Sequence, residues 1–235
     1  MLIVTKNPPT VIQELAKVPV DVEWGGIVRK SFWKGVKHYD LLGSLRGAVV
    51  EASPIGRLVA GATAWLNRNG GDLAACFAVG KEPWVGITAS NVMQGRLRVF
   101  CGMVEGDVRL VTECVVGANY TTHFDLHAES KALAAGWIQA ATKLDAIRSV
   151  LKSHRLLRSD VDNLLMDAAR KKFLPSKYVL GVDHLFREQP DSTAWDMLRA
   201  WSLGTTATPP HDQMAALLIF GRMLLKKCPN YKESA

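Results

Sequence analysis

The chain lacks long apolar runs, closely paired cysteines and glycine-rich phosphate loops. No segment of its 235 residues approaches the roughly 20 uninterrupted apolar residues of a membrane-spanning helix, and the N-terminal apolar run is too short for a signal peptide. The four cysteines form no CxxC pair, so their spacing fits neither a zinc ribbon nor a dense disulfide framework. These absences predict a soluble, cytoplasmic protein with reduced thiols and no membrane partner.

The motifs of common cofactor sites are also missing. Residues 79–82 (VGKE) lack the upstream glycine and the Ser or Thr of a P-loop, and no GxGxxG motif occurs. No segment resembles the nucleophile elbow of an α/β-hydrolase. The sequence therefore predicts no bound cofactor, and it favours a protein without a catalytic reaction of its own over an enzyme.

What the sequence does contain is an excess of positive charge on an ordinary globular composition. The net charge is +7, from 29 basic and 22 acidic residues, and the isoelectric point is near 9.3. Hydrophobic residues make up 48% of the chain, which suffices for a packed core and excludes a disordered protein. Such a protein is compatible with a polyanionic partner such as nucleic acid.

The spacing of apolar residues predicts an α+β fold in a single domain, 1–235. Its β-rich part is expected over 1–127 and its helical part over 128–235. Apolar, β-branched runs predict an antiparallel sheet with strands at 57–66, 73–79, 84–89, 97–104 and 108–116. Helices are predicted at 11–18, 40–51, 128–157, 176–187, 192–203, 212–227 and between Ser159 and Pro175. Thr10 and Ser159 are predicted N-caps, and Glu105-Gly106-Asp107 is a predicted hairpin turn.

The most distinctive local feature is the segment 28–39, VRKSFWKGVKHY, which mixes cations and aromatic rings without an acid. Cations neutralise phosphates and flat rings stack on unpaired bases, and these two terms dominate binding to single-stranded nucleic acid. A solvated basic loop with inward-facing rings is the alternative. The candidate phosphate contacts are Arg29, Lys30, Lys34 and Lys37, and the candidate stacking residues are Trp33 and either Phe32 or Tyr39.

Further cations gather in two other places. From Lys143 to Lys177 nine basic residues stand against four acidic ones, and the candidate phosphate contacts there are Lys152, Arg155, Arg158, Lys171 and Lys172. Several lie near predicted helix ends, where a cation also complements the helix dipole, so a structural role is the alternative. Arg96 and Arg98 alternate on a predicted strand, where they would suit a phosphate backbone or protect a sheet edge.

One short segment is a candidate metal site. In an extended strand alternate residues share a face, so His123, Asp125 and His127 would converge on one ion. Imidazole and carboxylate groups are ligands of zinc, iron and manganese. The segment lies where strand gives way to helix, however, and there such residues more often serve as caps or surface polar groups. The sequence therefore favours the absence of a metal.

Several segments carry a resemblance to a known family. They are residues 83–103 (PWVGITASNVMQGRLRVFCGM), 18–38 with Pro19 and Trp24, 62–77 (ATAWLNRNGGDLAACF), 191–206 (DSTAWDMLRAWSLGTT) and 214–224 (MAALLIFGRML). Together they resemble an uncharacterised phage and plasmid family catalogued as domain of unknown function 932. Its polar Asn-Ser-His-Asp run is replaced here by residues 91–94 (NVMQ). The resemblance implies a mixed α+β protein that acts in replication, recombination or transcription of a mobile element, and it supplies no catalytic residues.

These features predict a nucleic-acid-binding accessory protein of a phage or mobile element. It would prefer single-stranded DNA and form a homo-oligomer along the strand, and strand annealing is a more specific form of this function. The alternative is a non-catalytic interaction protein whose basic faces contact a host or phage protein of replication or transcription. A third hypothesis is a metal-dependent enzyme built on His123, Asp125 and His127.

Overall fold

The computed structural model of the chain describes residues 2–18, 35–53, 59–67, 70–91, 96–121, 123–172, 176–188, 192–229 and 231. Most of the predicted basic and aromatic segment lies outside them, namely Arg29, Lys30, Phe32, Trp33 and Lys34. Lys37 and Tyr39, at the end of that segment, are described and lie at the start of a helix.

Five strands form one antiparallel sheet in which each strand pairs with the next along the chain. They are β1 (Thr63–Asn67), β2 (Asp72–Ala78), β3 (Pro83–Ser90), β4 (Arg96–Glu105) and β5 (Val108–Asn119). Consecutive strands lie side by side because an antiparallel pair needs only a short connection. The predicted α+β class and antiparallel sheet are confirmed. The first strand, predicted over 57–66, spans Thr63–Asn67, and Val59 forms an isolated bridge to Val79.

The β4–β5 hairpin turns where the sequence predicts it. Glu105 pairs with Val108, which leaves Gly106 and Asp107 as the two loop residues. Gly106 has a φ angle of 57°, a left-handed conformation that two-residue hairpin turns require and that glycine adopts without steric cost. The predicted hairpin is therefore confirmed.

The described residues contain eight α-helices and a short 3-10 segment (Thr205–Ala207). The helices are α1 (Ile12–Leu15), α2 (His38–Ala52), α3 (Leu126–Ala141), α4 (Leu144–Ser153), α5 (Arg158–Arg170), α6 (Ser176–Arg187), α7 (Ala194–Gly204) and α8 (Pro210–Lys227). The single helix predicted over 128–157 is wrong, because α3 and α4 are separate. At the break the Thr142 hydroxyl donates to the Gln139 carbonyl oxygen (2.8 Å), and such local bonds compete with those of a helix.

Both predicted N-caps are also wrong. The helices α1 and α5 begin after Val11 and Leu157, and neither of these residues makes a side-chain capping bond. The backbone of Thr10 instead pairs with Ala64 of β1, and this pairing places the threonine before the helix rather than at its cap.

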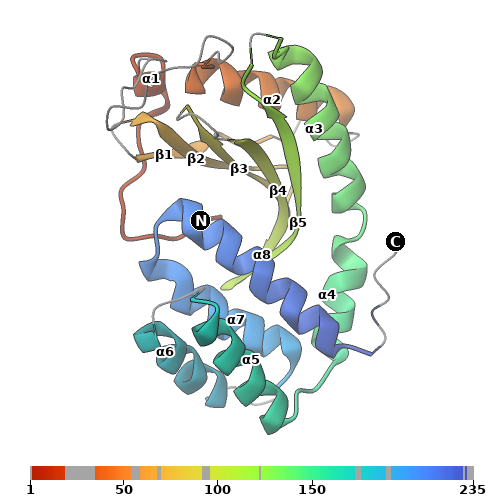
Figure 1. Ribbon diagram of the computed structural model, residues 1–235. Helices are drawn as coiled ribbons and strands as arrows, with labels where there is room; N and C mark the ends of the chain where they lie inside the picture. The colour runs from red at the N-terminus through yellow and green to blue at the C-terminus, as the bar shows by residue number, and fades with distance from the viewer. Residues whose placement is uncertain are drawn as a thin grey trace.

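Helices cover both faces of the sheet (Figure 1). On one face α2 and α3 lie together, and Val115 of β5 contacts α3 beside Gly136. On the other face α8 crosses the sheet, with Met214 beside Gly86 of β3. The helix α7 packs at the end where the β4–β5 hairpin lies, close to α4 and α6. One cluster of buried hydrophobic residues, which contains members from Ile3 to Cys228, joins the sheet to the helices.

The centre of the sheet is packed around Trp84, whose side chain is fully buried. Two glycines leave room for its indole ring. They are Gly86 on the same strand and Gly102 on β4, which is the cross-strand partner of Trp84. A Cβ atom at Gly102 would clash with the Leu110 carbonyl oxygen and would lie 2.6 Å from the indole. The Trp84 carbonyl oxygen accepts a hydrogen bond from Nε1 of Trp137 (3.1 Å), which ties the sheet to α3.

The helix α8 lies close against β5 as well. Gly221 is buried, and a Cβ atom there would lie 3.1 Å from the Val111 carbonyl oxygen. The residue before Gly221, Phe220, stacks on Trp201 of α7, with ring centroids 3.9 Å apart. The glycine therefore brings the backbone of α8 next to the strand, and the following residue, Arg222, emerges beside β5.

His38, the first residue of α2, is buried and has Nε2 2.9 Å from the Gly70 carbonyl oxygen. Burial lowers the pKa of His38 below its ordinary value of 6.5. His211 acts in the same direction, whereas Asp72 and the backbone at Gly70 and Gly71 act in the opposite one. The folded protein therefore keeps this imidazole neutral at pH values where the unfolded chain already binds a proton.

We expect Gly102→Ala to lower the free energy of unfolding by about 1–3 kcal/mol, because backbone rather than a movable side chain blocks the added methyl group. Urea denaturation followed by tryptophan fluorescence measures the change. Gly47→Ala is the control: a Cβ atom at that position of α2 meets nothing within 4 Å, and alanine stabilises a helix by roughly 0.5–1 kcal/mol relative to glycine. Equal stability of the two variants would contradict the close packing around Trp84.

We expect the free energy of unfolding to fall as the pH drops below about 6.5, because only the unfolded chain then binds a proton at His38 readily. Above that pH the histidine is neutral in both states, and its contribution is constant. His38→Gln keeps a donor for the Gly70 carbonyl oxygen and removes the titration. The loss of stability between about pH 7.5 and about pH 5 should be smaller in the variant, and an equal loss would refute this role of His38.

Candidate nucleic-acid interface

Arg96 and Arg98 lie at the start of β4, and both are exposed whereas Leu97 between them is buried. This alternation places the two guanidinium groups on one face of the sheet, as the sequence predicts. Protection of a sheet edge does not explain them, because β4 pairs with β3 on one side and with β5 on the other. The edge strands of the sheet are β1 and β5.

Lys37 and Tyr39 lie at the same end of the sheet as these arginines. Lys37 precedes α2, Tyr39 is its second residue, and both side chains are exposed. The Val36 N–H donates to Oδ1 of Asn91 (3.2 Å), and Nδ2 of Asn91 donates to the Val36 carbonyl oxygen (2.8 Å). These bonds hold the end of the predicted basic and aromatic segment to the end of β3, close to where β4 begins at Arg96.

Lys152 makes internal contacts. Its ammonium group pairs with Glu105 in the β4–β5 hairpin and lies 5.1 Å from the ring centroid of Trp195. Arg148, one turn earlier on α4, pairs with the same glutamate (3.4 Å) and with Glu82 (2.7 Å). These contacts fasten α4 to the sheet, so a structural role accounts for the position of Lys152.

The other predicted cations of the helical half are exposed but spread out. Arg155 precedes α5, Arg158 begins it, and Lys171 and Lys172 follow its last turn. Since α5 has 13 residues, its two ends lie about 20 Å apart. The helix packs against α6 and α8, at the opposite end of the molecule from α1 and α2 (Figure 1). Its cations therefore do not lie beside the arginines of β4.

The predicted metal ligands His123, Asp125 and His127 do not form a ligand set. Asp125 is the N-cap of α3, where its Oδ1 accepts hydrogen bonds from the N–H groups of His127 (2.9 Å) and Ala128 (3.2 Å). His127 is helical, so the strand alternation that would align the three side chains is absent. In the part of the chain that the structure describes, no group of three His, Cys, Asp or Glu side chains is placed to hold a metal ion.

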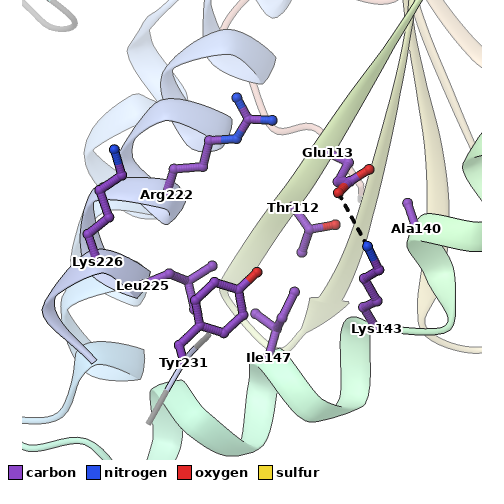
Figure 2. A pocket seen from close by; sticks show the side chains of 9 residues that line it. All are labelled: Thr112, Glu113, Ala140, Lys143, Ile147, Arg222, Leu225, Lys226 and Tyr231. Atoms are coloured by element: carbon purple, nitrogen blue, oxygen red, sulfur yellow. Dashed lines mark ion pairs between the residues drawn. The ribbon is translucent and has the colours of Figure 1, made fainter. Parts of the chain in front are cut away.

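A cationic pocket opens beside the middle of β5 (Figure 2). It has a volume of about 100 Å³ and is lined by β5, by the α3–α4 junction and by the last turns of α8. Figure 2 shows Arg222 reaching from α8, Lys143 rising toward Glu113, and the Tyr231 hydroxyl pointing into the space between them. The polar lining residues are Thr112, Glu113, Lys143, Arg222, Lys226 and Tyr231.

Positive charge exceeds negative charge in this pocket. Glu113 is the one carboxylate among the lining residues, and its Oε1 lies 3.8 Å from Nζ of Lys143. Arg222 and Lys226 are exposed on α8, and neither forms an ion pair with a described residue. Among the described lining residues, three cations and one carboxylate therefore leave an excess of two positive charges.

Arg98 belongs to the same charged surface. Burial raises the pKa of the Cys114 thiol above its ordinary value, and Arg98 and Arg222 are the charges that act in the opposite direction. Both guanidinium groups therefore lie within electrostatic reach of this residue of β5, one from β4 and the other from α8. We refer to Arg98, Lys143, Arg222 and Lys226 as the β5 basic surface.

Arg222 and Lys226 are not among the contacts predicted from the sequence. They lie four residues apart on α8 and so share one helix face. Like charges at this spacing destabilise a helix by roughly 0.2–0.5 kcal/mol. Arg222 interrupts the apolar run 214–225 and Lys226 follows it, and this spacing is the sequence feature that could have indicated a charged site. Lys143 appears in the sequence only as one member of a long run of charges.

Comparisons with known proteins leave the chain without a match. No protein-family model matches it, and neither a curated protein nor a solved structure is significantly similar to it. The resemblance to the family of domain of unknown function 932 therefore stays a prediction. Among the described helices, none combines the length and the hydrophobicity needed to cross a membrane.

We expect Asp125→Ala to lower the free energy of unfolding by about 1 kcal/mol, because two N–H groups at the start of α3 lose their acceptor. His123→Ala is the control, since His123 is exposed and should change the stability by no more than about 0.5 kcal/mol. Denaturation curves measure both effects, and elemental analysis gives a second readout. One equivalent of metal that is lost in both variants would instead support a metal site.

Proposed function

We propose that the protein binds single-stranded DNA through the β5 basic surface. The observation that carries this proposal is the pocket beside β5, whose described lining holds three cations and one carboxylate, and where no described acid pairs with Arg222 or Lys226. Unbalanced cations repel one another, and a polyanion that neutralises them releases its condensed counterions. Charge alone therefore favours a bound phosphate backbone at this surface.

The cations follow one strand of the sheet. Arg96 pairs with Asn119 at the end of β5, and Arg98 pairs with Val116. The pocket lies at Glu113, six residues before Asn119, which corresponds to about 20 Å of strand. A phosphate backbone that runs along β5 would meet the two arginines at one end and Lys143, Arg222 and Lys226 at the other.

Two tyrosines are candidate stacking residues. Tyr39 is 46% exposed at the start of α2, and Tyr231 lines the pocket. Stacking of a base on an aromatic ring contributes roughly 1–3 kcal/mol and depends little on sequence. Rings at these places favour a single strand, whose bases are free to stack, over a duplex. Trp33, the stacking residue predicted from the sequence, lies outside the described residues.

In this proposal the protein is a non-catalytic accessory factor in the cytoplasm of the host cell. It acts in replication, recombination or transcription of a phage or mobile element, as the family resemblance implies. Copies of the chain bind side by side as a homo-oligomer, because a strand presents the same backbone charge along its whole length. If the protein acts in recombination, the more specific form of this function is the annealing of complementary single strands.

A host or phage protein partner is the second candidate. Leu157, Met166 and Leu180 lie on or next to α5 and α6, and their side chains are 70%, 52% and 72% exposed. Large exposed apolar side chains on neighbouring helices are typical of a contact surface. None of the three belongs to the β5 basic surface, so the two candidates are separable by substitution.

We expect fluorescence anisotropy of a labelled oligo-dT to show binding that weakens steeply with salt and that exceeds binding to a duplex of equal length. On a single strand the log–log slope is about −0.7 for each phosphate contact. Arg98→Gln removes one contact and keeps a polar side chain, so we expect the slope to become shallower by about 0.7.

Lys131→Gln is the matched control, because Lys131 is an exposed cation of α3, which covers the opposite face of the sheet. This variant should keep the wild-type slope. Binding that does not depend on salt, or equal losses in the two variants, would contradict the proposal. No oligonucleotide binding, combined with specific capture of one host protein that Leu180→Glu abolishes, would favour the second candidate.

A further inference from the structure

The pocket of the β5 basic surface has the size of one small anion. Its volume of about 100 Å³ is far below the roughly 300–1,000 Å³ of sites that enclose a drug-sized ligand. A pocket of this size suits a small anion such as phosphate better than a large organic ligand.

The charge around the pocket matches a dianion. In the part of the lining that the structure describes, Lys143, Arg222 and Lys226 are accompanied by one carboxylate, which leaves two positive charges. A phosphomonoester carries a charge of about −1.5 to −2 at pH 7, because its second pKa is near 6. A phosphodiester within a strand carries a single negative charge, so it would leave one of the two positive charges unbalanced.

The donors also suit a phosphate group. The guanidinium of Arg222 presents a planar fork of N–H donors that matches phosphate oxygens, and Lys143 adds a compact ammonium charge. Figure 2 shows these two groups and the Tyr231 hydroxyl on different sides of the same space. Thr112 adds a second hydroxyl group to the lining. Oxygens of one phosphate can therefore meet donors from β5, from the α3–α4 junction and from α8.

We infer that this pocket binds a single phosphomonoester group. If the proposed function holds, on which this second step rests, the group is the terminal phosphate of the bound strand. The lining supports an end rather than an interior phosphate, because β5, the α3–α4 junction and α8 enclose the pocket from three directions. A terminal phosphate needs only one connection to the strand. In a homo-oligomer, the copy at the strand end would hold it, and the other copies would contact interior phosphates through Arg98 and the other exposed cations of the β5 basic surface.

The test compares three labelled oligo-dT strands of equal length, with a 5′-phosphate, with a 3′-phosphate, or with hydroxyl groups at both ends. We expect one of the phosphorylated strands to bind about tenfold more tightly than the hydroxyl-ended strand, because hydrogen bonds to a charged group are strong. Arg222→Gln should remove this preference and keep weaker binding of the hydroxyl-ended strand. Lys131→Gln should keep the preference.

Inorganic phosphate tests the pocket without nucleic acid. At constant ionic strength, phosphate in place of chloride should raise the Tm of the wild-type protein by mass action and should leave that of Arg222→Gln unchanged. Equal affinity for all three strands together with no rise in Tm would overturn the inference, although salt-dependent strand binding would stand. A terminal-phosphate preference that survives in Arg222→Gln would overturn the assignment to this pocket. A rise in Tm without any strand binding would support the phosphate pocket and overturn the proposed function.

Discussion

The close contact between α8 and β5 is the constraint on which the charged surface depends. Gly221 is buried against Val111 and has no side chain to hold the helix away from the strand. Arg222 follows immediately, and Lys226 lies one turn later on the same helix face. Because the helix backbone lies so near the strand, both cations stand beside Glu113 and Lys143 and not on a separate surface.

The pairing of charges elsewhere explains why this surface stays positive. At contacts between helices, and between a helix and the hairpin, cations form ion pairs with carboxylates. Lys227 of α8 pairs with Asp160 of α5 (3.0 Å), and Arg199 of α7 pairs with Asp107 of the hairpin (3.1 Å). Where α8 meets the open edge of β5, Glu113 is the one carboxylate that lines the pocket. Among the described residues the positive charge is therefore distributed unevenly, and one part of it without ion-pair partners lies beside β5.

Much of the fold could be predicted because its signals are local. Strands β2 to β5 follow runs of apolar and β-branched residues between turn residues, and the β4–β5 hairpin needs little more than the backbone freedom of Gly106. The break between α3 and α4 could not be predicted in this way, since the apolar spacing continues through it. At the break the Thr142 hydroxyl bonds to the Gln139 carbonyl oxygen, and Arg148 of α4 pairs with Glu82 and Glu105, which are far away in sequence.

By itself the sequence determined the α+β class, the antiparallel sheet and the excess of positive charge, because these follow from composition and from patterns over a few residues. It did not determine which cations act together. Lys152, prominent in the sequence, is held by the hairpin, whereas Arg98, Lys143 and Arg222 meet although they are far apart along the chain. Electrostatic forces depend on distance in space, so only the tertiary structure decided where charge remains unbalanced.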